Sequence, residues 1–369
     1  MTPTPKSDSF NITKEREILP ENFTSRQEPS NPNLLLSIHY LRAAAAIMVL
    51  IHHAKGEQPC FYNPISNYNS FAFGVDIFFV ISGFIMIMSA SDEKINNFYR
   101  RRFIRVVPLY WIATLCLIIF KLKGNIDFTH FIKSMLLIPY YYSRSPDHIW
   151  PILVPGWTLS FEMFFYLIFG VGLYLRNVLR FTTVIIFLLV GLGAIFHPQN
   201  AILKTFTDSL MLEFLGGAYV AILFKRYGFA RLKLLLPIGF ALLLAPEAAK
   251  NALPIVGFLP TGLFAGMIVI GALGFEGGRG VPTWSIPKLL GDASYVIYLF
   301  QAVFLDFVRR VVSKFPLDGP VQLIVMIVCA LGVSIVGGIV VHRLLEKPLT
   351  RWLSRITTKT VKSGHNSRE

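Results

Sequence analysis

Long apolar runs separated by short polar joints make up most of the chain after residue 33. A helix needs about 20 mostly apolar residues to cross the hydrocarbon core of a bilayer, and runs of that length recur between the joints. The pattern predicts spans over residues 34–53, 70–90, 106–123, 156–175, 181–197, 205–224, 232–248, 254–275, 292–311 and 319–341. We therefore expect an all-α polytopic membrane protein with about ten transmembrane helices.

A shorter apolar stretch, Phe128 to Tyr142, follows the third predicted span. Its apolar core is too short to cross the bilayer, and it is rich in aromatic residues, which gather at the level of the lipid headgroups. The stretch is predicted to be an interfacial or re-entrant helix.

The composition agrees with a membrane protein. Of the 369 residues, 54% are hydrophobic and 15% are charged, and the mean hydropathy is +0.56, whereas soluble domains carry roughly 25% charged residues. Residues 1–33 are rich in Pro, Asn, Ser and charge, which predicts a disordered cytoplasmic tail rather than a signal peptide. Residues 34–355 are expected to form one membrane domain, and 356–369 a basic cytoplasmic tail.

The net charge is +14, and the distribution of Lys and Arg along the chain predicts its membrane topology. Lys and Arg are interleaved with the apolar runs, which indicates no nucleic-acid partner. The tails and joints predicted to be cytoplasmic hold more than twice as many Lys and Arg as the opposite joints, so both termini are expected inside. The cluster of Arg309, Arg310 and Lys314 on the outside is an exception. The three cysteines are far apart and predict neither a disulfide framework nor a zinc site.

The first span holds Arg42 near its middle and ends in His52 and His53. Arg42 and His53 are eleven positions apart, which places them on one helix face about 16 Å apart. An intramembrane Arg is costly and normally faces a polar cavity or a partner, so its position favours a functional site. The alternative is a snorkelling arginine with an interfacial histidine pair.

The second span contains Asp76 near its outer end and Ser82 two turns deeper. Asp76 is predicted at the depth of the two histidines, where a carboxylate can orient and polarise an imidazole. Ser82 and Gly83 are more often packing residues between membrane helices than a catalytic pair.

The third span is preceded by Arg102 and Arg105, which share a helix face. Basic residues at a cytoplasmic edge are usually topology signals, but this spacing also suits a phosphate or pyrophosphate. In the fourth span, Trp157 is an interfacial anchor and Glu162 lies about a turn and a half inside, where a carboxylate needs a partner or water. In the ninth span, Asp292 is predicted to cap a helix that carries Tyr298.

These segments together resemble the membrane acyltransferase family 3, the sugar O-acyltransferases that modify exopolysaccharides, O-antigens and Nod factors. The resemblance spans about residues 34–355 and is closest to the exopolysaccharide-modifying members. It rests on the segments Leu41–Ala54, Gly74–Phe84, Arg102–Trp111, Trp157–Glu162, Gly291–Tyr295 and Glu346–Pro348, in the expected order.

The resemblance implies transfer of an acyl group, expected to be acetyl, from cytoplasmic acyl-CoA to a hydroxyl of a glycan or lipid-linked glycan at the bacterial inner membrane. It places the family's arginine and histidine on Arg42 and His53, and the CoA-binding pair on Arg102 and Arg105. Acyl-CoA is then a co-substrate, with no resident cofactor or metal expected. Gln301 stands where many members carry a second histidine, which puts that histidine's role in doubt here.

Acyl transfer to a hydroxyl needs a base for the attacking oxygen and a stabiliser for the developing oxyanion. His53 is predicted to be the base or, alternatively, a covalent carrier of the acyl group. Asp76 is predicted to orient His53, with Glu162 and Arg42 in supporting catalytic roles. The residues expected to contact the substrate are Trp157, Ser82 and Tyr298.

Two other classes of protein fit the same spans. A transporter or flippase of a glycan or anionic substrate would also place Arg, His and Glu inside the membrane, although the sequence shows no inverted repeat. A non-catalytic membrane partner of a glycan synthase is the third alternative. Loss of glycan acylation on replacing His53, without loss of the protein from the membrane, would single out the enzyme.

Overall fold

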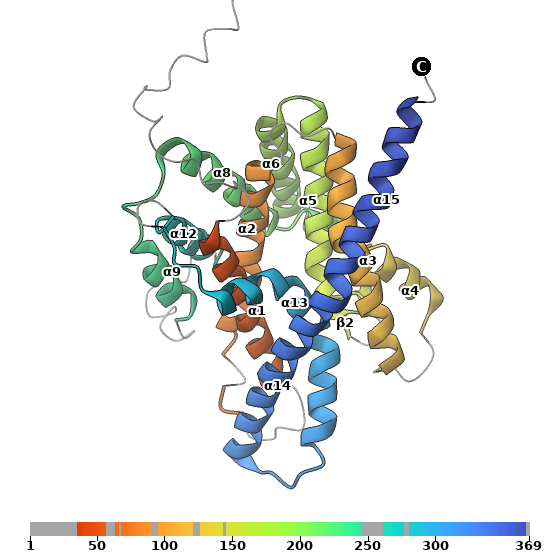
Figure 1. Cartoon of the computed structure of the whole chain (residues 1–369), viewed down its shortest axis with the longest axis vertical. Coiled ribbons are helices and arrows are strands. Elements are labelled where there is room, and N and C mark those ends of the chain that lie inside the picture. Colours follow the sequence, from red (N-terminus) through yellow and green to blue (C-terminus); the bar gives the residue numbers. More distant parts are fainter. Residues whose placement is uncertain are drawn as a thin grey trace, which may run out of the picture. The chain divides into compact units, whose positions relative to one another are not determined.

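The computed structural model describes residues 35–56, 63–65, 68–89, 95–120, 126–142, 145–245, 261–276 and 280–366. The predicted tail over residues 1–33 lies outside this part of the chain. Within it, the described elements are helices apart from one short hairpin, which confirms the all-α class. Figure 1 shows the helices and their labels.

Among the described residues, seven helical segments are long and apolar enough to cross a membrane. They are Leu36–Gly56 (α1), Ser70–Ser89 (η3 and α2), Ile95–Phe120 (α3), Val154–Tyr174 (η4 and α5), Val178–Phe196 (α6), Ala201–Tyr227 (α7 and α8) and Gly319–Thr357 (α14 into α15). Three more predicted spans overlap the shorter helices Leu235–Leu243 (α9) and Thr261–Leu273 (α12) and the 28-residue helix Ser285–Val312 (α13). The count of ten transmembrane helices stays a prediction.

The bundle has a buried centre and a lipid-facing periphery. In the most apolar window of α5, 61% of the residues are buried, against 11% in α6 and 22% in the segment that contains α14. Because lipid tails are as apolar as the exposed side chains, this leaves α6 and α14 suited to face the bilayer. The polar residues of α1, α2 and α5 are enclosed by the other helices.

Glycines let α2 and α8 approach closely. A Cβ on Gly83 would lie 1.8 Å from the carbonyl oxygen of Phe214, and one on Gly217 would lie 1.9 Å from that of Val80. No side chain fits at either distance, so both positions require glycine, and backbone packs against backbone as in other membrane helix pairs. Gly83 is therefore a packing residue, as the sequence indicates, and it fixes the position of the neighbouring Ser82.

Stacked aromatic rings hold α5 against α2 and α8. The Phe79 ring stacks on Phe214 with centroids 4.5 Å apart, and Phe165 stacks on Phe214 at 4.9 Å. Ring pairs of this kind contribute about 0.5–1.5 kcal/mol beyond the area that they bury. The stack fixes the depth of α5, the helix that carries Glu162.

The predicted helix over residues 128–142 is shorter than expected. The helix α4 covers Phe128–Met135, and Asp127 caps it by accepting a bond from the backbone nitrogen of Thr129 at 3.0 Å. Leu137 then takes a left-handed conformation (φ 56°) and Pro139 follows, which ends the helix. Tyr141–Tyr142 (β1) instead pairs antiparallel with Ser145–Ile149 (β2).

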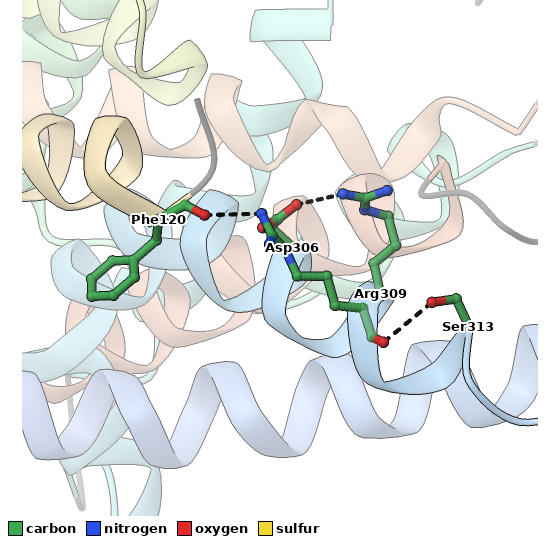
Figure 2. A network of polar contacts seen from close by, with 5 residues as sticks. Phe120, Asp306, Arg309 and Ser313 are labelled. Atoms are coloured by element: carbon green, nitrogen blue, oxygen red, sulfur yellow. Dashed lines mark hydrogen bonds and ion pairs between the residues drawn. The ribbon is translucent and has the colours of Figure 1, made fainter. Parts of the chain in front are cut away.

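Arg309 and Arg310, from the cluster predicted to lie outside, are paired with the carboxylate of Asp306, as Figure 2 shows. Asp306, on α13, is 3% exposed and accepts bonds from Arg309 Nη2 at 2.6 Å and Arg310 Nε at 2.7 Å. Arg310 Nη2 also donates to the carbonyl oxygen of Phe120 at 2.9 Å, at the last residue of α3. Arg310 thus links α13 to α3, while Arg309 pairs with Asp306 within α13.

The C-terminal part of the bundle is one long, nearly continuous helix. Gly319–Val341 (α14) passes through a π-helical turn, His342–Glu346 (η5), into Lys347–Asn366 (α15). Figure 1 shows α15 running on from α14 toward the C-terminus, with α3 beside it. Arg100 Nη1 donates to the carbonyl oxygen of Thr357 at 3.0 Å, which ties the basic end of α3 to α15. The predicted C-terminal tail therefore begins inside a helix.

Candidate active site

A polar cavity lies between five helices in the middle of the bundle. Its volume of about 70 Å³ holds several waters, since one water occupies roughly 10–15 Å³ on this measure. It is lined by residues of α1, α2, α3, α5 and α13 that lie far apart in the sequence. The polar ones are Arg42, Ser82, Arg105, Thr158, Glu162, Tyr295 and Tyr298.

Arg42 is the central charge of this cavity. Its guanidinium interacts electrostatically with four charged groups on other helices, which are Arg105, Glu346, Glu162 and Asp292. Three carboxylates therefore lie within electrostatic range of Arg42, which helps to explain how α1 can carry a cation deep inside an apolar segment. Arg42 thus lines a cavity together with other polar residues, and its functional role stays a prediction.

Glu162 is held by two hydroxyl groups. Ser82 Oγ, on α2, donates to Glu162 Oε1 at 3.1 Å, and the hydroxyl of Tyr166, one turn later on α5, donates to the same oxygen. Bonds to an ionised acceptor are about twice as strong as neutral ones. The sequence showed no acid or base beside Ser82, and the fold supplies one from 80 residues away.

The two arginines of α3 have different surroundings. Arg105 lines the cavity, whereas Arg102 is 7% exposed and lies between α2, α3 and α5. Arg102 Nη2 donates to Ser89 Oγ at 2.8 Å, and its guanidinium carbon lies 5.6 Å from the ring centroids of both Phe98 and Tyr166. Both arginines face the centre of the bundle, but only Arg105 belongs to the cavity lining.

Two histidine–carboxylate pairs lie near the arginines. His39 Nδ1, on α1, is 3.1 Å from Asp292 Oδ1, on α13, and His342 Nδ1 bonds to Glu346 within the π-helical turn. The prediction that Asp292 caps a helix is wrong, because α13 begins at Ser285, two turns earlier. Asp292 instead joins α13 to α1, and Gly291 beside it allows that contact, since a Cβ there would lie 2.2 Å from the carbonyl oxygen of His39.

Tyrosines of α13 fix the far wall of the cavity. Tyr298 Oη donates to the carbonyl oxygen of Pro155 at 3.1 Å and lies 2.9 Å from Thr158 Oγ1. Tyr295 Oη donates to the carbonyl oxygen of Val106 at 2.9 Å. One turn beyond Tyr298, Gln301 is 1% exposed, and neither atom of its side-chain amide has a partner among the described residues.

His53 and Asp76 lie at the other end of α1 and α2, outside the cavity lining. The rings of His52 and His53 meet edge to face, with centroids 5.3 Å apart. Asp76 Oδ1 accepts a bond from Thr261 Oγ1, on α12, at 2.5 Å, and Glu213 of α8 lies against the same carboxylate. The orientation of His53 by Asp76 stays a prediction.

The predicted site residues thus divide into two sets. Arg42, Ser82, Arg105, Glu162 and Tyr298 line one cavity, and His53, Asp76, Arg102 and Trp157 lie outside it. Trp157 lines a separate cleft on the other side of α5.

Sequence reasoning missed several residues of this network. Tyr166 is four residues after Glu162, a spacing that puts both on one helix face and that signals the contact. Glu213 is a carboxylate inside the sixth predicted span, where an ionisable residue by itself marks a candidate functional position. Glu346 belongs to the Glu-Lys-Pro segment, but no local pattern indicates that it lies within electrostatic range of Arg42.

Comparisons with known proteins give one family match and two similar sequences. A family model described as an acyltransferase domain matches residues 35–343. The chain is 34% identical over 295 residues to the exopolysaccharide production protein ExoZ of Rhizobium meliloti (strain 1021), which covers 76% of this chain and 90% of that protein. It is 34% identical over 103 residues to the acyltransferase MdmB of Streptomyces mycarofaciens, covering 26% of each. No solved structure matches.

Proposed function

Because the chain belongs to acyltransferase family 3, we propose that it transfers an acyl group from cytoplasmic acyl-CoA to a hydroxyl of a cell-surface or exported glycan. The observation that carries the proposal is the family match over residues 35–343, which takes in each helix that lines the polar cavity. A glycan acceptor is supported by the relative named for exopolysaccharide production. Acetyl-CoA is the proposed donor.

The donor is proposed to bind at the end of the bundle that carries Arg102 and Arg105. Arg105 faces the cavity and is placed to bind a phosphate, while the packed Arg102 adds positive potential behind it. Arg42 lies deeper, where it stabilises negative charge that develops on the acyl carbonyl oxygen. Glu162, which Ser82 and Tyr166 hold in place, compensates part of the charge of Arg42.

The reaction is proposed to use His53 as the general base. The acceptor hydroxyl oxygen attacks the thioester carbonyl carbon while His53 takes the hydroxyl proton. The tetrahedral oxyanion then collapses, the carbon–sulfur bond breaks, and the CoA thiolate leaves and takes up a proton. About 16 Å of helix separates Arg42 from His53, so either the pantetheine arm reaches along α1 or His53 carries the acyl group.

The proposal includes a topology. Ten spans with both termini in the cytoplasm put Arg102 and Arg105 on the side where acyl-CoA is made, and His53 toward the side where glycans are exported. The bacterial inner membrane is the proposed location. Cysteine labelling of residues 128–142 from outside the cell tests this arrangement, and labelling from the cytoplasm alone would contradict it.

Purified protein in lipid nanodiscs, given acetyl-CoA and an exopolysaccharide acceptor, is expected to release free CoA thiol and acetylate the glycan. His53→Ala is expected to lower that rate by at least about 100-fold, because a positioned base contributes roughly 10²–10⁴-fold. His52→Ala is the matched control, since the neighbouring histidine has no role in the proposal, and it is expected to keep the wild-type rate.

The same assay distinguishes the alternatives. If wild-type protein releases no CoA above the level without acceptor, the acyltransferase proposal fails, and transport of unmodified glycan into vesicles would favour a flippase. Radiolabelled acetyl-CoA without acceptor tests the two roles of His53. Label that stays on the denatured protein and is absent from His53→Ala identifies an acyl carrier, and its absence from both identifies a base.

A further inference from the structure

A second cleft lies on the other side of α5, and it is much larger than the polar cavity. Its volume is about 220 Å³, against about 70 Å³ for the cavity. Its walls come from the hairpin β1–β2 and its flanks, the first turns of α5, and the segment from α7 to the start of α8. The residues that matter for its chemistry are Tyr140, Asp147, Trp150, Trp157, Lys204 and Asp208.

The cleft and the cavity are separate sites. Trp157 and Phe161 line the cleft, whereas Thr158 and Glu162 line the cavity, so the two use different faces of one helix. The Phe79 ring lies between them, with its centroid 6.3 Å from that of Trp157 and 6.0 Å from that of Phe161. A ligand in the cleft therefore does not occupy the cavity.

The cleft also lies toward the end of α5 opposite to the basic end of α3. Trp157 begins α5, while Tyr99 Oη, next to the arginines, donates to the carbonyl oxygen of Leu167 in the second half of α5. The cleft thus lies at the end where α5 begins, on the opposite face of α5 from the cavity that Arg105 lines.

Two tryptophans supply flat apolar walls. The Trp150 ring stacks on His148 with centroids 4.0 Å apart, and the Trp157 ring meets Phe161 edge to face at 5.8 Å. These contacts restrict both indoles, so a ligand that packs on them orders little further. A flat aromatic face with polar groups around it suits a molecule that has an apolar face and a polar rim.

The polar groups of the cleft favour hydroxyl donors. Asp147 is exposed, and Asp208 is held in place by the bond that its Oδ1 accepts from the backbone nitrogen of Leu210 at 2.9 Å. Two carboxylates against the single amine of Lys204 disfavour an anionic ligand, and carboxylates accept strong bonds from hydroxyl groups. A pyranose ring without acidic groups combines these features, with C–H groups on its faces and hydroxyls around its edge.

The walls are pre-formed. Tyr141 Oη donates to the carbonyl oxygen of Gln199 at 2.8 Å, which joins the hairpin to the connection between α6 and α7. Ser134 Oγ accepts a bond from the backbone nitrogen of Ile152 at 3.0 Å, and Tyr110 Oη donates to the carbonyl oxygen of Ser134 at 2.8 Å. The segment that carries Trp150 directly follows β2, and Ser134 of α4 links it to Tyr110 of α3. The hairpin itself is linked through Tyr141 to the connection between α6 and α7.

We propose that this cleft is a carbohydrate-binding subsite that holds a neutral sugar residue of the acceptor glycan, away from the hydroxyl that is acylated. The identification of the sugar chain as the acceptor rests on the proposed function, but the binding of the sugar does not. The subsite retains a polymer while the reacting residue enters the bundle separately.

The test is direct binding without any acyl donor. Purified protein in nanodiscs is titrated with neutral gluco- and galacto-oligosaccharides of increasing length and with fragments of the producing cell's own polysaccharide, and tryptophan fluorescence is followed. Saturable quenching is expected in the wild type. Trp150→Ala and Asp147→Asn are each expected to weaken binding by at least about tenfold, the loss of one good contact.

Matched controls lie outside the cleft. Trp352→Ala removes an exposed tryptophan of α15, and Asp318→Asn neutralises an exposed carboxylate before α14, and both are expected to bind as the wild type does. Absence of saturable binding with every oligosaccharide, or undiminished binding in both cleft variants, would overturn the subsite.

Turnover separates this proposal from the proposed function. With an acylating preparation, the cleft variants are expected to raise KM for a polymeric acceptor at unchanged kcat and unchanged KM for acetyl-CoA. A protein that binds oligosaccharide through Trp150 but releases no CoA would refute the acyltransferase proposal and leave the subsite standing. If the protein acylates glycans and neither cleft variant changes its kinetics, the subsite is refuted and the acyltransferase proposal stands.

Discussion

The first turns of α5 have two faces with opposite character. Thr158 and Glu162 face a small cavity whose charges are compensated by other helices, while Trp157 and Ser160 face a wider cleft with aromatic walls. Compensated charges hold a fixed geometry, as chemistry requires, whereas restricted rings with polar neighbours suit reversible binding. One helix thus positions both environments, and a shift of α5 would alter both at once.

Replacing one carboxylate in the cavity and one in the cleft is expected to give the largest difference in kcat between the two sites. Glu162→Gln keeps an oxygen that accepts from Ser82 and Tyr166 but removes the charge beside Arg42, and it is expected to lower kcat about 100-fold. Asp147→Asn, its counterpart in the cleft, is expected to leave kcat unchanged. Steady-state CoA release at saturating glycan measures both. Equal losses of kcat in the two variants would mean that the faces are not functionally distinct.

Separate substitutions of Arg102 and Arg105, the two arginines of α3, test whether one binds the donor and the other stabilises the fold. Arg105→Ala removes the cavity-lining cation and is expected to raise KM for acetyl-CoA about tenfold, since a bond to a charged group contributes roughly 1.5–3 kcal/mol. Arg102→Ala loses the bond to Ser89 and two ring contacts, so it is expected to lower the thermal unfolding temperature more than Arg105→Ala does. Identical KM and Tm values in both variants would contradict this division of roles.

The smallest effect on turnover is expected from the packing of α2. Gly83→Ala is expected to destabilise the protein by about 1–3 kcal/mol, because its Cβ would overlap the backbone of α8, and to reduce turnover only a few-fold. Gly216→Ala, on α8, is the control, since nothing lies within 4 Å of its added Cβ. Thermal unfolding in nanodiscs compares the two. A Gly83→Ala protein as stable as Gly216→Ala would show that the close approach is not required.

Hydropathy predicted the helices well because the bilayer requires uninterrupted apolar length. Each of the ten predicted spans overlaps a described helix, although residues 246–260 of the seventh and eighth lie outside the described part of the chain. The errors lie where helices extend into polar sequence. The first two turns of α13 contain Pro287, Lys288 and Gly291, and that polarity hid the helix before Asp292.

The sequence alone indicates which polar residues are candidates for the site, but it does not indicate which of them contact one another. Arg42 and Glu162 stand out because ionisable groups are costly in apolar spans. Their neighbours depend on helix packing, so the bond from Ser82 to Glu162 cannot be read from either segment alone. The cleft gave still less signal, because β1 lies at the end of a stretch whose aromatics indicate an interfacial helix equally well, and β2 lies beyond that stretch.

The ion pairs of Asp306 with Arg309 and Arg310 affect the insertion of α13 into the membrane. Its two arginine partners lie three and four residues later on the same helix, so the counter-charge is in place as soon as that turn of α13 forms. Before Arg310 can bond to α3, the three side chains of Asp306, Arg309 and Arg310 together carry about one net positive charge, instead of the two that the arginines alone would carry. In the predicted topology, where this end of α13 lies outside, these ion pairs lower the local cost of moving a basic segment across the bilayer.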